Sequence, residues 1–339
     1  MTKILTMGEM LLRLKPTDHQ RIIQANTYDA NYGGSEANVA VSLALLGDDV
    51  ELLTKLPQNA LGDMALNTVR QYGVKTQKIL RGGRRLGIYF FEKGASVRNT
   101  NVVYDRADSS FATVSRTEFD WEKLLGNVDY FYFSGITAAL SDSIRASLLD
   151  ACKACRDRNV TVVCDMNYRG KMWTPKEAQA CMQTLMPYIN ICIANDEDFE
   201  ATLGIKAFDG DMTRGIEQKQ QFEQAMREVQ AKYPNCHTVA SVLRDIHSVE
   251  DSQWTAMMLH DGQMVEGPTY KMHVYEGVAG GDAFGAGLVH GFVNGFKAQE
   301  LIDYAITASV MKLTIPGDLN LATDQDIRNA MASGNSVNR

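Results

Sequence analysis

The 339-residue chain lacks the two commonest phosphate-binding fingerprints. It contains no G-x-x-x-x-G-K-[ST] segment, and no G-x-G-x-x-G segment follows its first predicted strand. These absences disfavour a P-loop NTPase and an ordinary dinucleotide-binding fold. If the protein handles phosphate, another part of the sequence must bind it.

Membrane-length apolar runs, basic runs and a signal-peptide layout are absent too. No window approaches about 18 uninterrupted apolar residues, so we expect a soluble, cytoplasmic protein without a membrane partner. The formal net charge is −7, and without a basic face we expect no nucleic-acid partner. A small anionic substrate requires arginines gathered in one cleft against this overall charge.

The six cysteines, at positions 152, 155, 164, 181, 192 and 236, lie in apolar helical or strand-like runs. A disulfide scaffold is short and rich in loops, so we expect reduced thiols in the core instead. Cys152-x-x-Cys155 has no second pair at zinc-ligand spacing, and no structural metal is expected. No repeat and no Pro- or Ser-rich linker divides the chain, which favours one domain.

Apolar segments of strand and helix type alternate along most of the chain. This alternation predicts an α/β fold with a doubly wound, mainly parallel sheet flanked by helices. Strands are expected at residues 4–14, 50–56, 128–135, 160–164, 189–194, 237–243 and 254–259, and helices at residues 36–46, 63–72, 141–158, 175–185, 218–232 and 301–313. Residues 333–339 are expected to fray.

The alternation breaks between residues 79 and 113. Segments 86–92 and 101–106 have the pattern of paired strands, and with strands between residues 11 and 28 they predict a small projecting sheet that acts as a lid. The expected boundaries are a main domain of residues 1–10, 36–85 and 112–339, and a lid of residues 11–35 and 86–111.

The two faces of the predicted lid differ in the side chains that they carry. Tyr104 and Arg106 are two residues apart and share a face, so they either point at a ligand beneath the lid or form an exposed polar edge. Leu86, Ile88 and Phe90 would form an apolar face that needs cover. This face predicts a homo-oligomer assembled through the lid sheet.

The stretch from Glu276 to Gly287 reads E-G-V-A-G-G-D-A-F-G-A-G and leads into an apolar helical run. Glycines let backbone N–H groups approach an anion, and a helix N-terminus favours negative charge, so the pattern indicates a phosphate-binding loop. Asp282 within it is a candidate general base for a hydroxyl. Alternatively, Asp282 is only the N-cap of the helix.

A second tight turn precedes the helix expected from residue 36. Either Ser35 caps that helix, or Gly33 and Gly34 let the backbone close on a ligand that Asn38 faces. The sequence leaves both interpretations open.

Polar residues follow two of the predicted strands. Ligands of open α/β sheets bind beyond the carboxyl ends of strands, so Arg169, in the segment Asp165-Met166-Asn167-Tyr168-Arg169, is a candidate cleft arginine. The segment Asn195-Asp196-Glu197-Asp198 can hold hydrated Mg²⁺ through water, or it can cap the following helix.

Taken together, these motifs resemble the ribokinase-like (PfkB) carbohydrate kinases. The Gly33-Gly34 turn, the Asn195 segment and the loop Ala279-Gly280-Gly281-Asp282 look like the three signatures of that family, in order and over nearly the whole chain. The segments at residues 8–14, 32–40 and 165–169 look most like 2-keto-3-deoxygluconate kinases. The resemblance implies a ribokinase-like fold and ATP with Mg²⁺ as cofactors.

The resemblance also implies roles for individual residues. Asp282 would be the base that activates the sugar hydroxyl, and the amides of Ala279, Gly280, Gly281 and Asp282 would form the anion hole. The positions that match contacts to an acidic sugar are Gly34, Tyr89, Tyr104, Arg106, Arg169 and Asp318. Asn195 and Asp198 match the ATP–Mg²⁺ motif, with the metal held through water, and Gly280 would also contact the nucleotide.

The sequence departs from the family pattern in three places. The usual G-A-G-D loop here begins with Ala279, and the substitutions stay small, so the anion hole should survive. The usual N-x-x-E motif here ends in Asp198 with Glu197 beside it, so either carboxylate can organise the metal water. Arg244 stands where relatives often have a glycine-rich turn, and we assign it to the nucleotide phosphates.

The expected activity is ATP-dependent phosphorylation of the terminal hydroxyl of 2-keto-3-deoxygluconate. Arg106 and Arg169 carry the choice of an acidic sugar, because a neutral hexose needs no guanidinium whereas a carboxylate gains charge-assisted hydrogen bonds. The alternatives are another sugar kinase of fructokinase type and a non-catalytic sugar-binding regulator on the same fold.

Overall fold

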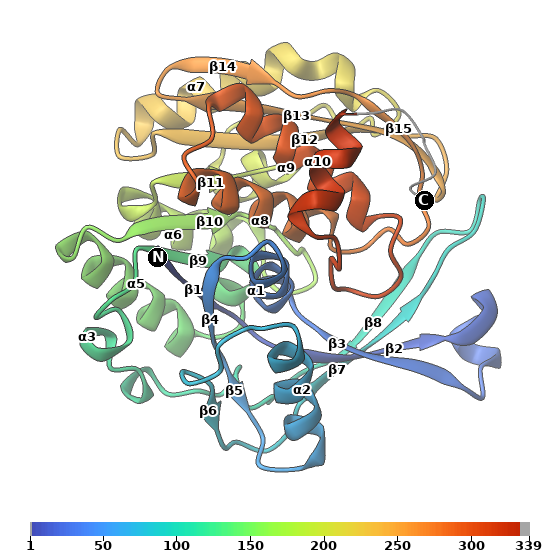
Figure 1. Cartoon of the computed structure of the whole chain (residues 1–339), viewed down its shortest axis with the longest axis vertical. Coiled ribbons are helices and arrows are strands. Elements are labelled where there is room, and N and C mark those ends of the chain that lie inside the picture. The colour runs from blue at the N-terminus through green and yellow to red at the C-terminus, as the bar shows by residue number, and fades with distance from the viewer. Residues whose placement is uncertain (1, 333–339) are drawn as a thin grey trace.

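The computed structural model of the protein describes residues 2–332 (Figure 1). The fraying expected at residues 333–339 lies outside the described residues. Strands and helices alternate as the sequence predicts, and they build one large sheet between two layers of helices, with a smaller sheet at one side.

The large sheet has nine strands: β1 (Lys3–Met7), β4 (Asp49–Leu53), β9 (Tyr130–Ser134), β10 (Thr161–Asp165), β11 (Ile191–Ile193), β12 (Thr238–Ile246), β13 (Asp251–His260), β14 (Gln263–Glu266) and β15 (Tyr270–His273). Their order is β14-β13-β12-β11-β10-β9-β1-β4, and β15 pairs with β13. The strands from β4 to β12 pair in parallel, whereas β12, β13 and β14 pair antiparallel. The prediction of a mainly parallel sheet is confirmed.

Two large hydrophobic clusters form the core, one on each face of the large sheet, and a small third cluster lies beside them. One face is covered by α1 (Ser35–Leu45), α2 (Ala60–Gln71), α8 (Gly280–Val293) and α9 (Ala298–Lys312), with α10 (Asp324–Ala332) packed on α9. The other is covered by α3 (Trp121–Leu124), α4 (Gly135–Ala139), α5 (Asp142–Asp157), α6 (Pro175–Leu185) and α7 (Lys219–Lys232).

Helix α5 illustrates how the sequence specifies these layers. Ser141 precedes it and accepts a hydrogen bond from the amide of Ile144, which satisfies one of the free donors of the first turn. Ile144, Leu148 and Ala151 are buried at helical spacing, so the stripe that they form faces the sheet.

The lid is a four-stranded sheet of β2 (Leu11–Pro16), β3 (Tyr28–Gly33), β7 (Gly87–Glu92) and β8 (Asn101–Asp105), in the order β3-β2-β7-β8. A separate two-stranded pair joins β5 (Lys55–Leu56) and β6 (Leu80–Arg81). The lid projects from the large sheet, as Figure 1 shows at the lower right. The predicted small sheet is therefore present.

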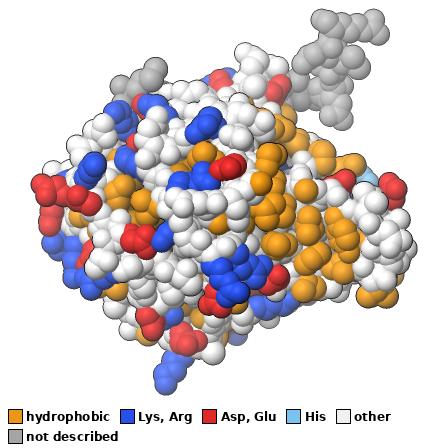
Figure 2. All heavy atoms as spheres, turned by 90° about the horizontal axis from the view of Figure 1, so that it is seen from below, with side chains coloured by type: hydrophobic (Ala, Val, Ile, Leu, Met, Phe, Trp, Pro, Cys, Tyr) orange, Lys and Arg blue, Asp and Glu red, His pale blue; other side chains and the backbone are white. Residues whose placement is uncertain are grey.

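Side chains alternate between the two faces of the lid. Tyr89 and Tyr104 are register partners on the inner face, which turns toward the main domain. Leu14, Phe90 and Val103 share the outer face through the pairs Leu14–Phe90 and Phe90–Val103. Figure 2 shows hydrophobic side chains gathered on this projecting side of the molecule.

Three sequence expectations about the lid and its surroundings need correction. The single opening strand at 4–14 is two strands, because the chain leaves the large sheet after Met7 and enters the lid at Leu11. Leu86 is only 3% exposed and packs in the core, so it is not part of an uncovered face. Arg106 lies just beyond the end of β8 at Asp105.

All six cysteines are buried and unpaired, as predicted. Within residues 2–332, no helix combines the length and the apolar character needed to cross a membrane.

Candidate active site

A cavity of about 630 Å³ lies between the inner face of the lid and the carboxyl ends of the strands of the large sheet. Strand β1 lies between β4 and β9 in that sheet, so the chain crosses over in opposite directions on its two sides. Ligands of open α/β sheets bind at this kind of switch point. The cavity therefore lies where the topology favours a ligand site.

The structure brings all of the predicted site residues to this cavity, although they come from distant parts of the chain. The residues that line it include Gly34, Tyr89, Tyr104, Arg106, Arg169, Asn195, Glu197, Asp198, Arg244, Ala279, Gly280, Gly281, Asp282 and Asp318. The inner-face alternative for Tyr104 and Arg106 is thus favoured over an exposed polar edge.

The glycine loop (residues 276–282) ends in the first turn of α8. Ala279 stands before the helix in the left-handed conformation, with φ of 59°, and its carbonyl accepts the amide of Ala283. The amides of Gly280, Gly281 and Asp282 donate to no described residue. These free donors and the positive end of the helix dipole face the cavity, as an anion site requires.

Asp282 lies in the first turn of α8, whose N-cap is Ala279, so the interpretation of Asp282 as the N-cap is wrong. Its Oδ1 accepts a hydrogen bond of 2.7 Å from the hydroxyl of Ser35. Its Oδ2 accepts a hydrogen bond of 2.7 Å from the side-chain amide (Nδ2) of Asn38. Burial raises the pKa of Asp282, while these two hydrogen bonds and then Arg169 lower it. The carboxylate is therefore held in one orientation at the edge of the cavity.

The tight turn before α1 positions the side chains that donate hydrogen bonds to the Asp282 carboxylate. A Cβ added to Gly34 would lie 2.0 Å from the carbonyl oxygen of Glu9, so only glycine permits this approach of the two backbones. The amide of Gly34 donates to Asn38 Oδ1 at 3.3 Å, which fixes the orientation of the Asn38 amide group toward Asp282. Ser35 makes no capping hydrogen bond. Its hydroxyl orients Asp282 instead, a role that no local pattern could indicate.

Asp165, at the end of β10, is a second buried carboxylate on the cavity. Burial, followed by the charges of Asp198 and Asp282, raises its pKa well above the usual range, and Arg169 opposes this rise. Its Oδ1 has no hydrogen-bond partner among the described residues. A buried oxygen without a partner is costly unless a ligand, water or ion contacts it.

Asp198 and Glu197 differ in what they are free to bind. The two oxygens of Asp198 accept the backbone amides of Tyr168, at 2.7 Å, and Asn195, at 2.9 Å. Burial raises the pKa of Asp198 to about 6, although these backbone hydrogen bonds act in the opposite direction. The Glu197 side chain is exposed on the cavity and has no polar partner among the described residues. Asp198 therefore holds two loops together, and Glu197 is the carboxylate free to bind water.

Three arginines line the cavity, and two of them are neutralised. Arg106 pairs with Glu9, which is itself buried, and its Nε lies 2.9 Å from Glu9 Oε2. Arg244 pairs with Asp196 and lies over the ring of Trp254. Arg169 has no carboxylate within ion-pair distance among the described residues and donates only to the carbonyl of Tyr168, at 2.8 Å. Its positive charge is therefore available to a ligand.

A network of buried charged side chains lies behind the cavity wall. This network was not predicted from the sequence. Arg13 on β2 pairs with Glu276, at 2.7 Å, and with Asp318, at 3.1 Å, and all three side chains are at most 3% exposed. Asp318 also accepts the hydroxyl of Tyr89 at 2.6 Å. Alternation along β2 could have placed Arg13 on the inner face, but its partners come from segments hundreds of residues away.

Comparison with known proteins identifies the family. Residues 1–324 match the pfkB family of carbohydrate kinases. A 2-dehydro-3-deoxygalactonokinase from Haloferax volcanii is 28% identical over 339 residues, with 98% of each chain covered. The match spans both the nine-stranded and the four-stranded sheet.

Solved structures agree with this match. The crystal structure of 2-dehydro-3-deoxygluconokinase from Thermotoga maritima is 42% identical, with a TM-score of 0.93, and the alignment covers 98% of this chain and 100% of that chain. A fructokinase from Xylella fastidiosa with bound ATP is 17% identical, with a TM-score of 0.74 and coverage of 97% and 98%, and shares the fold. The chain belongs to the pfkB family of carbohydrate kinases and is a phosphotransferase with an alcohol acceptor on a ribokinase-like fold.

Proposed function

We propose that this kinase uses ATP to phosphorylate the terminal hydroxyl of 2-keto-3-deoxygluconate. The relative from Thermotoga maritima, with 42% identity along nearly the whole chain, bears the name of this activity. The Arg169 guanidinium supports the choice of substrate, because it faces the cavity without a carboxylate partner among the described residues. A sugar carboxylate would supply the missing partner through charge-assisted hydrogen bonds.

In the proposed reaction, Asp282 accepts the proton of the sugar hydroxyl as that oxygen attacks the γ-phosphorus. The bond between the γ-phosphorus and the bridging oxygen breaks, and ADP leaves. The free amides of Gly280, Gly281 and Asp282 stabilise the charge on the phosphoryl oxygens. Ser35 and Asn38 hold the base in the orientation that proton transfer requires.

The residues around the cavity suit ATP with Mg²⁺. The unpartnered Oδ1 of Asp165 and the exposed Glu197 offer oxygens to the water shell of the ion, which prefers oxygen ligands and keeps several waters. Bound Mg²⁺ would neutralise the negative charge of the phosphates. We assign Asp198 to holding the Tyr168 and Asn195 backbones. We assign Arg244, which lines the cavity, to contact with the nucleotide phosphates.

The Haloferax volcanii relative supports a second candidate substrate. Its name specifies the galactonate epimer, which differs from the gluconate compound in the configuration of one hydroxyl-bearing carbon. Both sugars carry the carboxylate that Arg169 would bind, so this arginine does not discriminate between them.

A coupled assay for ADP release tests the proposal. The panel contains 2-keto-3-deoxygluconate, its galactonate epimer, fructose and ribose, each with ATP and Mg²⁺. We expect the highest kcat/KM for 2-keto-3-deoxygluconate. Faster turnover of fructose or ribose would show a neutral-sugar kinase, and sugar binding without ADP release would show a non-catalytic regulator.

We also propose that two copies of the chain associate through the outer face of the lid. Leu14, Ile88, Phe90 and Val103 leave apolar area uncovered there, and Val103 is 47% exposed. Light scattering should give a mass above 37.6 kDa. Val103→Glu should lower that mass without changing turnover, and a monomeric mass for the unmodified protein would contradict the proposal.

A cytoplasmic location belongs to the same proposal. The six buried thiols are unpaired, and reducing compartments keep cysteines in that state. Cell fractionation tests it, and recovery in an extracellular or membrane fraction would contradict it.

A further inference from the structure

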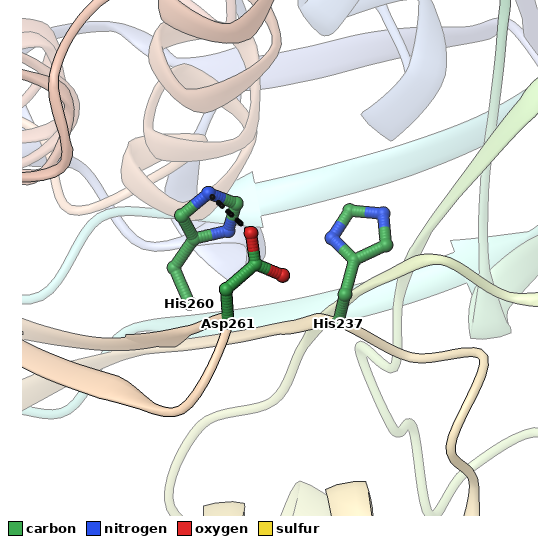
Figure 3. A group of neighbouring side chains, drawn as sticks. All are labelled: His237, His260 and Asp261. Carbon is green, nitrogen blue, oxygen red and sulfur yellow. Dashed lines mark ion pairs between the residues drawn. The ribbon is translucent and has the colours of Figure 1, made fainter.

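Two histidines and an aspartate gather at the end of the large sheet that lies away from the cavity. His237 immediately precedes β12, His260 is the last residue of β13, and Asp261 begins the turn into β14. One possible ligand atom from each side chain lies within 4.8 Å of the others. Figure 3 shows the three side chains converging from the two neighbouring chain segments.

The backbone fixes this arrangement. Thr238 and His260 are register partners in the antiparallel ladder, and the amide of Asp261 donates to the carbonyl of His237 at 2.9 Å. The side chain of Gln230, on α7, also donates to the carbonyl of His237, at 2.9 Å. Asp261 has φ of 47° and is followed by Gly262, so a tight turn fixes the backbone that carries the carboxylate. The cluster is therefore preformed.

The hydroxyl of Thr238 fixes the tautomer of at least one of the two imidazoles. It lies 3.0 Å from Nδ1 of His237 and 2.8 Å from Nδ1 of His260. One hydroxyl has a single proton, so it donates to at most one ring, and the other ring must donate its Nδ1–H to the oxygen. That one ring, when neutral, has its lone pair on Nε2. A hydrogen-bond partner on the second ring nitrogen is typical of histidines that bind metals.

The distances and exposure suit a metal ion. His260 Nε2 lies 3.5 Å from Asp261 Oδ2, close to the roughly 3.4 Å between two ligands at tetrahedral Zn²⁺ with bonds of about 2.0–2.2 Å. His260 is 28% exposed and Asp261 is 70% exposed, so an ion can reach them from solvent.

We propose that His237, His260 and Asp261 bind one divalent transition-metal ion, with Zn²⁺ as the best match and water in the fourth position. Imidazole ligands favour Zn²⁺, Cu²⁺ or Ni²⁺ over Mg²⁺, so the site is chemically distinct from the Mg²⁺ proposed at the cavity. Thr238 begins β12, whereas Val242 and Arg244 of the same strand line the cavity. The ion would clamp β12 to β13 at the end of the hairpin and stabilise the fold without entering catalysis.

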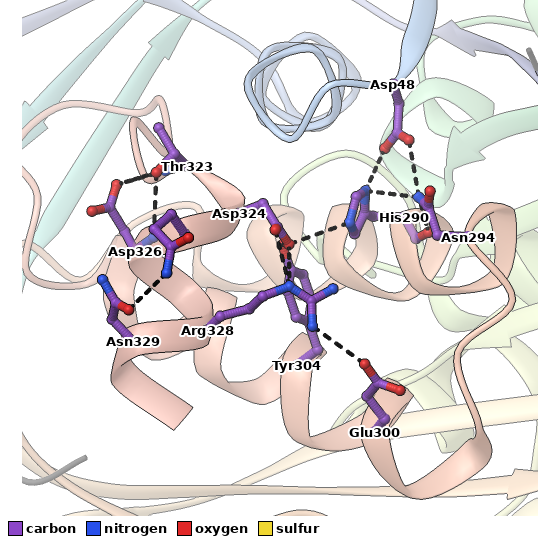
Figure 4. Close-up of polar contacts among 11 residues, drawn as sticks. Asp48, His290, Asn294, Glu300, Tyr304, Thr323, Asp324, Asp326, Arg328 and Asn329 are labelled. Atoms are coloured by element: carbon purple, nitrogen blue, oxygen red, sulfur yellow. Dashed lines mark hydrogen bonds and ion pairs between the residues drawn. The ribbon is translucent and has the colours of Figure 1, made fainter. Parts of the chain in front are cut away.

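A second histidine cluster shows what a fully paired arrangement looks like (Figure 4). His290 is 5% exposed, and its two nitrogens face Asp48, at 2.8 Å, and Asp324, at 3.7 Å. Asp324 also pairs with Arg328 and accepts the hydroxyl of Tyr304. A guanidinium already balances this carboxylate, and the ring is sealed from solvent. The His290 cluster therefore joins α8 to α10 and leaves no position for an ion.

Titration of the untagged protein with Co²⁺, followed by its visible absorption, tests the metal site. We expect one equivalent of Co²⁺ to bind, and isothermal titration calorimetry with Zn²⁺ should give the same stoichiometry. Bound Zn²⁺ should also raise the midpoint temperature of thermal unfolding. His260→Gln and Asp261→Asn should each weaken binding by more than about tenfold, since each removes one of three ligands. His273→Gln is the matched control, because His273 faces only Asp251 and is 78% exposed.

Asp261→Asn keeps the test decisive if a histidine variant folds poorly, because Asn tolerates the left-handed conformation of an exposed turn. Turnover with the sugar substrate reports that each variant is folded, and it should be unchanged. The proposal is overturned if the protein shows no saturable binding near one equivalent. It is also overturned if Asp261→Asn binds Co²⁺ as tightly as the His273→Gln control, since Asp261 would then not be a ligand of the ion.

Discussion

Arg13 on the lid and Glu276 at the start of the glycine loop form an ion pair of 2.7 Å in which neither side chain is exposed. Lys15 reaches the other oxygen of Glu276 at 2.9 Å, and the amide of Gly317 donates to Glu276 Oε1 at 3.2 Å. Glu276 therefore ties together the lid, the glycine loop and the segment that carries Asp318. The position of the lid and the shape of the anion site depend on the same buried charges.

Replacing Arg13 with Met should destabilise the protein by about 3–5 kcal/mol, because it leaves buried carboxylates without their partner. Chemical denaturation with urea measures the change. Arg156→Met is the control, since Arg156 pairs with Asp157 at an exposed position and should have no resolvable effect. Equal stability of the two variants would show that the buried pair contributes nothing.

Asp282→Asn should lower kcat by at least about 10²–10³, the effect of removing one stabilising group in other enzymes. The affinity for the sugar should change little, because the variant keeps the shape of the side chain. Single-turnover kinetics and calorimetry measure the two quantities separately. A variant with near-normal turnover would remove Asp282 from the mechanism.

Asn38→Ala should move the acid limb of the pH profile of kcat to higher pH. The Asn38 amide donates to the ionised Asp282 and lowers its pKa, so its loss raises that pKa. A base acts only when deprotonated, so the rate then falls at a higher pH than in the unmodified protein.

Ser35→Ala removes the other donor and should move the limb in the same direction. A limb that stays in place in both variants would show that Asp282 is not the titrating base.

Arg169→Gln should raise the KM for 2-keto-3-deoxygluconate by about 10–100-fold, since a hydrogen bond to a charged group contributes about 1.5–3 kcal/mol. The KM for ATP serves as the internal control and should stay within about twofold if the guanidinium contacts only the sugar. Arg169→Lys should recover part of the loss, because it keeps the charge without the bidentate geometry. An unchanged sugar KM in Arg169→Gln would contradict the acid-sugar assignment.

Ala279→Gly should stabilise the protein by about 0.5–1 kcal/mol. The left-handed conformation costs alanine about 1–2 kcal/mol, and the greater freedom of unfolded glycine offsets part of the gain. Ala283→Gly is the matched control inside α8, where the same change should destabilise by about 1 kcal/mol. Thermal unfolding of both variants measures the difference, and destabilisation of both would show that Ala279 is not strained.

Much of the site was predictable because its signals are local. Glycines before an apolar helix indicate an anion loop, and polar residues after a strand indicate the ligand edge of an α/β sheet. Arg169 and Asp282 were identified from such patterns. The pairing of Tyr89 with Tyr104 was not predicted, because alternation within two strands does not fix the register between them.

The features that the sequence predicted wrongly or not at all have a common cause. Leu86 reads as a lid residue from alternation, yet it is packed in the core. Ser35 reads as a helix cap, yet its hydroxyl reaches a residue 247 positions later. Periodicity within a segment says nothing about what that segment meets in space.

The sequence by itself determined the alternation of strands and helices, the glycine loop, the candidate base and the arginine at the strand end. Each of these depends on residues within a few positions of one another. Only the tertiary structure decided which arginine keeps its charge free, which groups orient Asp282, and that Arg13 and Glu276 join the lid to the loop. Those features depend on charges and hydrogen-bond donors that meet only after distant segments pack, and burial then makes each pairing energetically decisive.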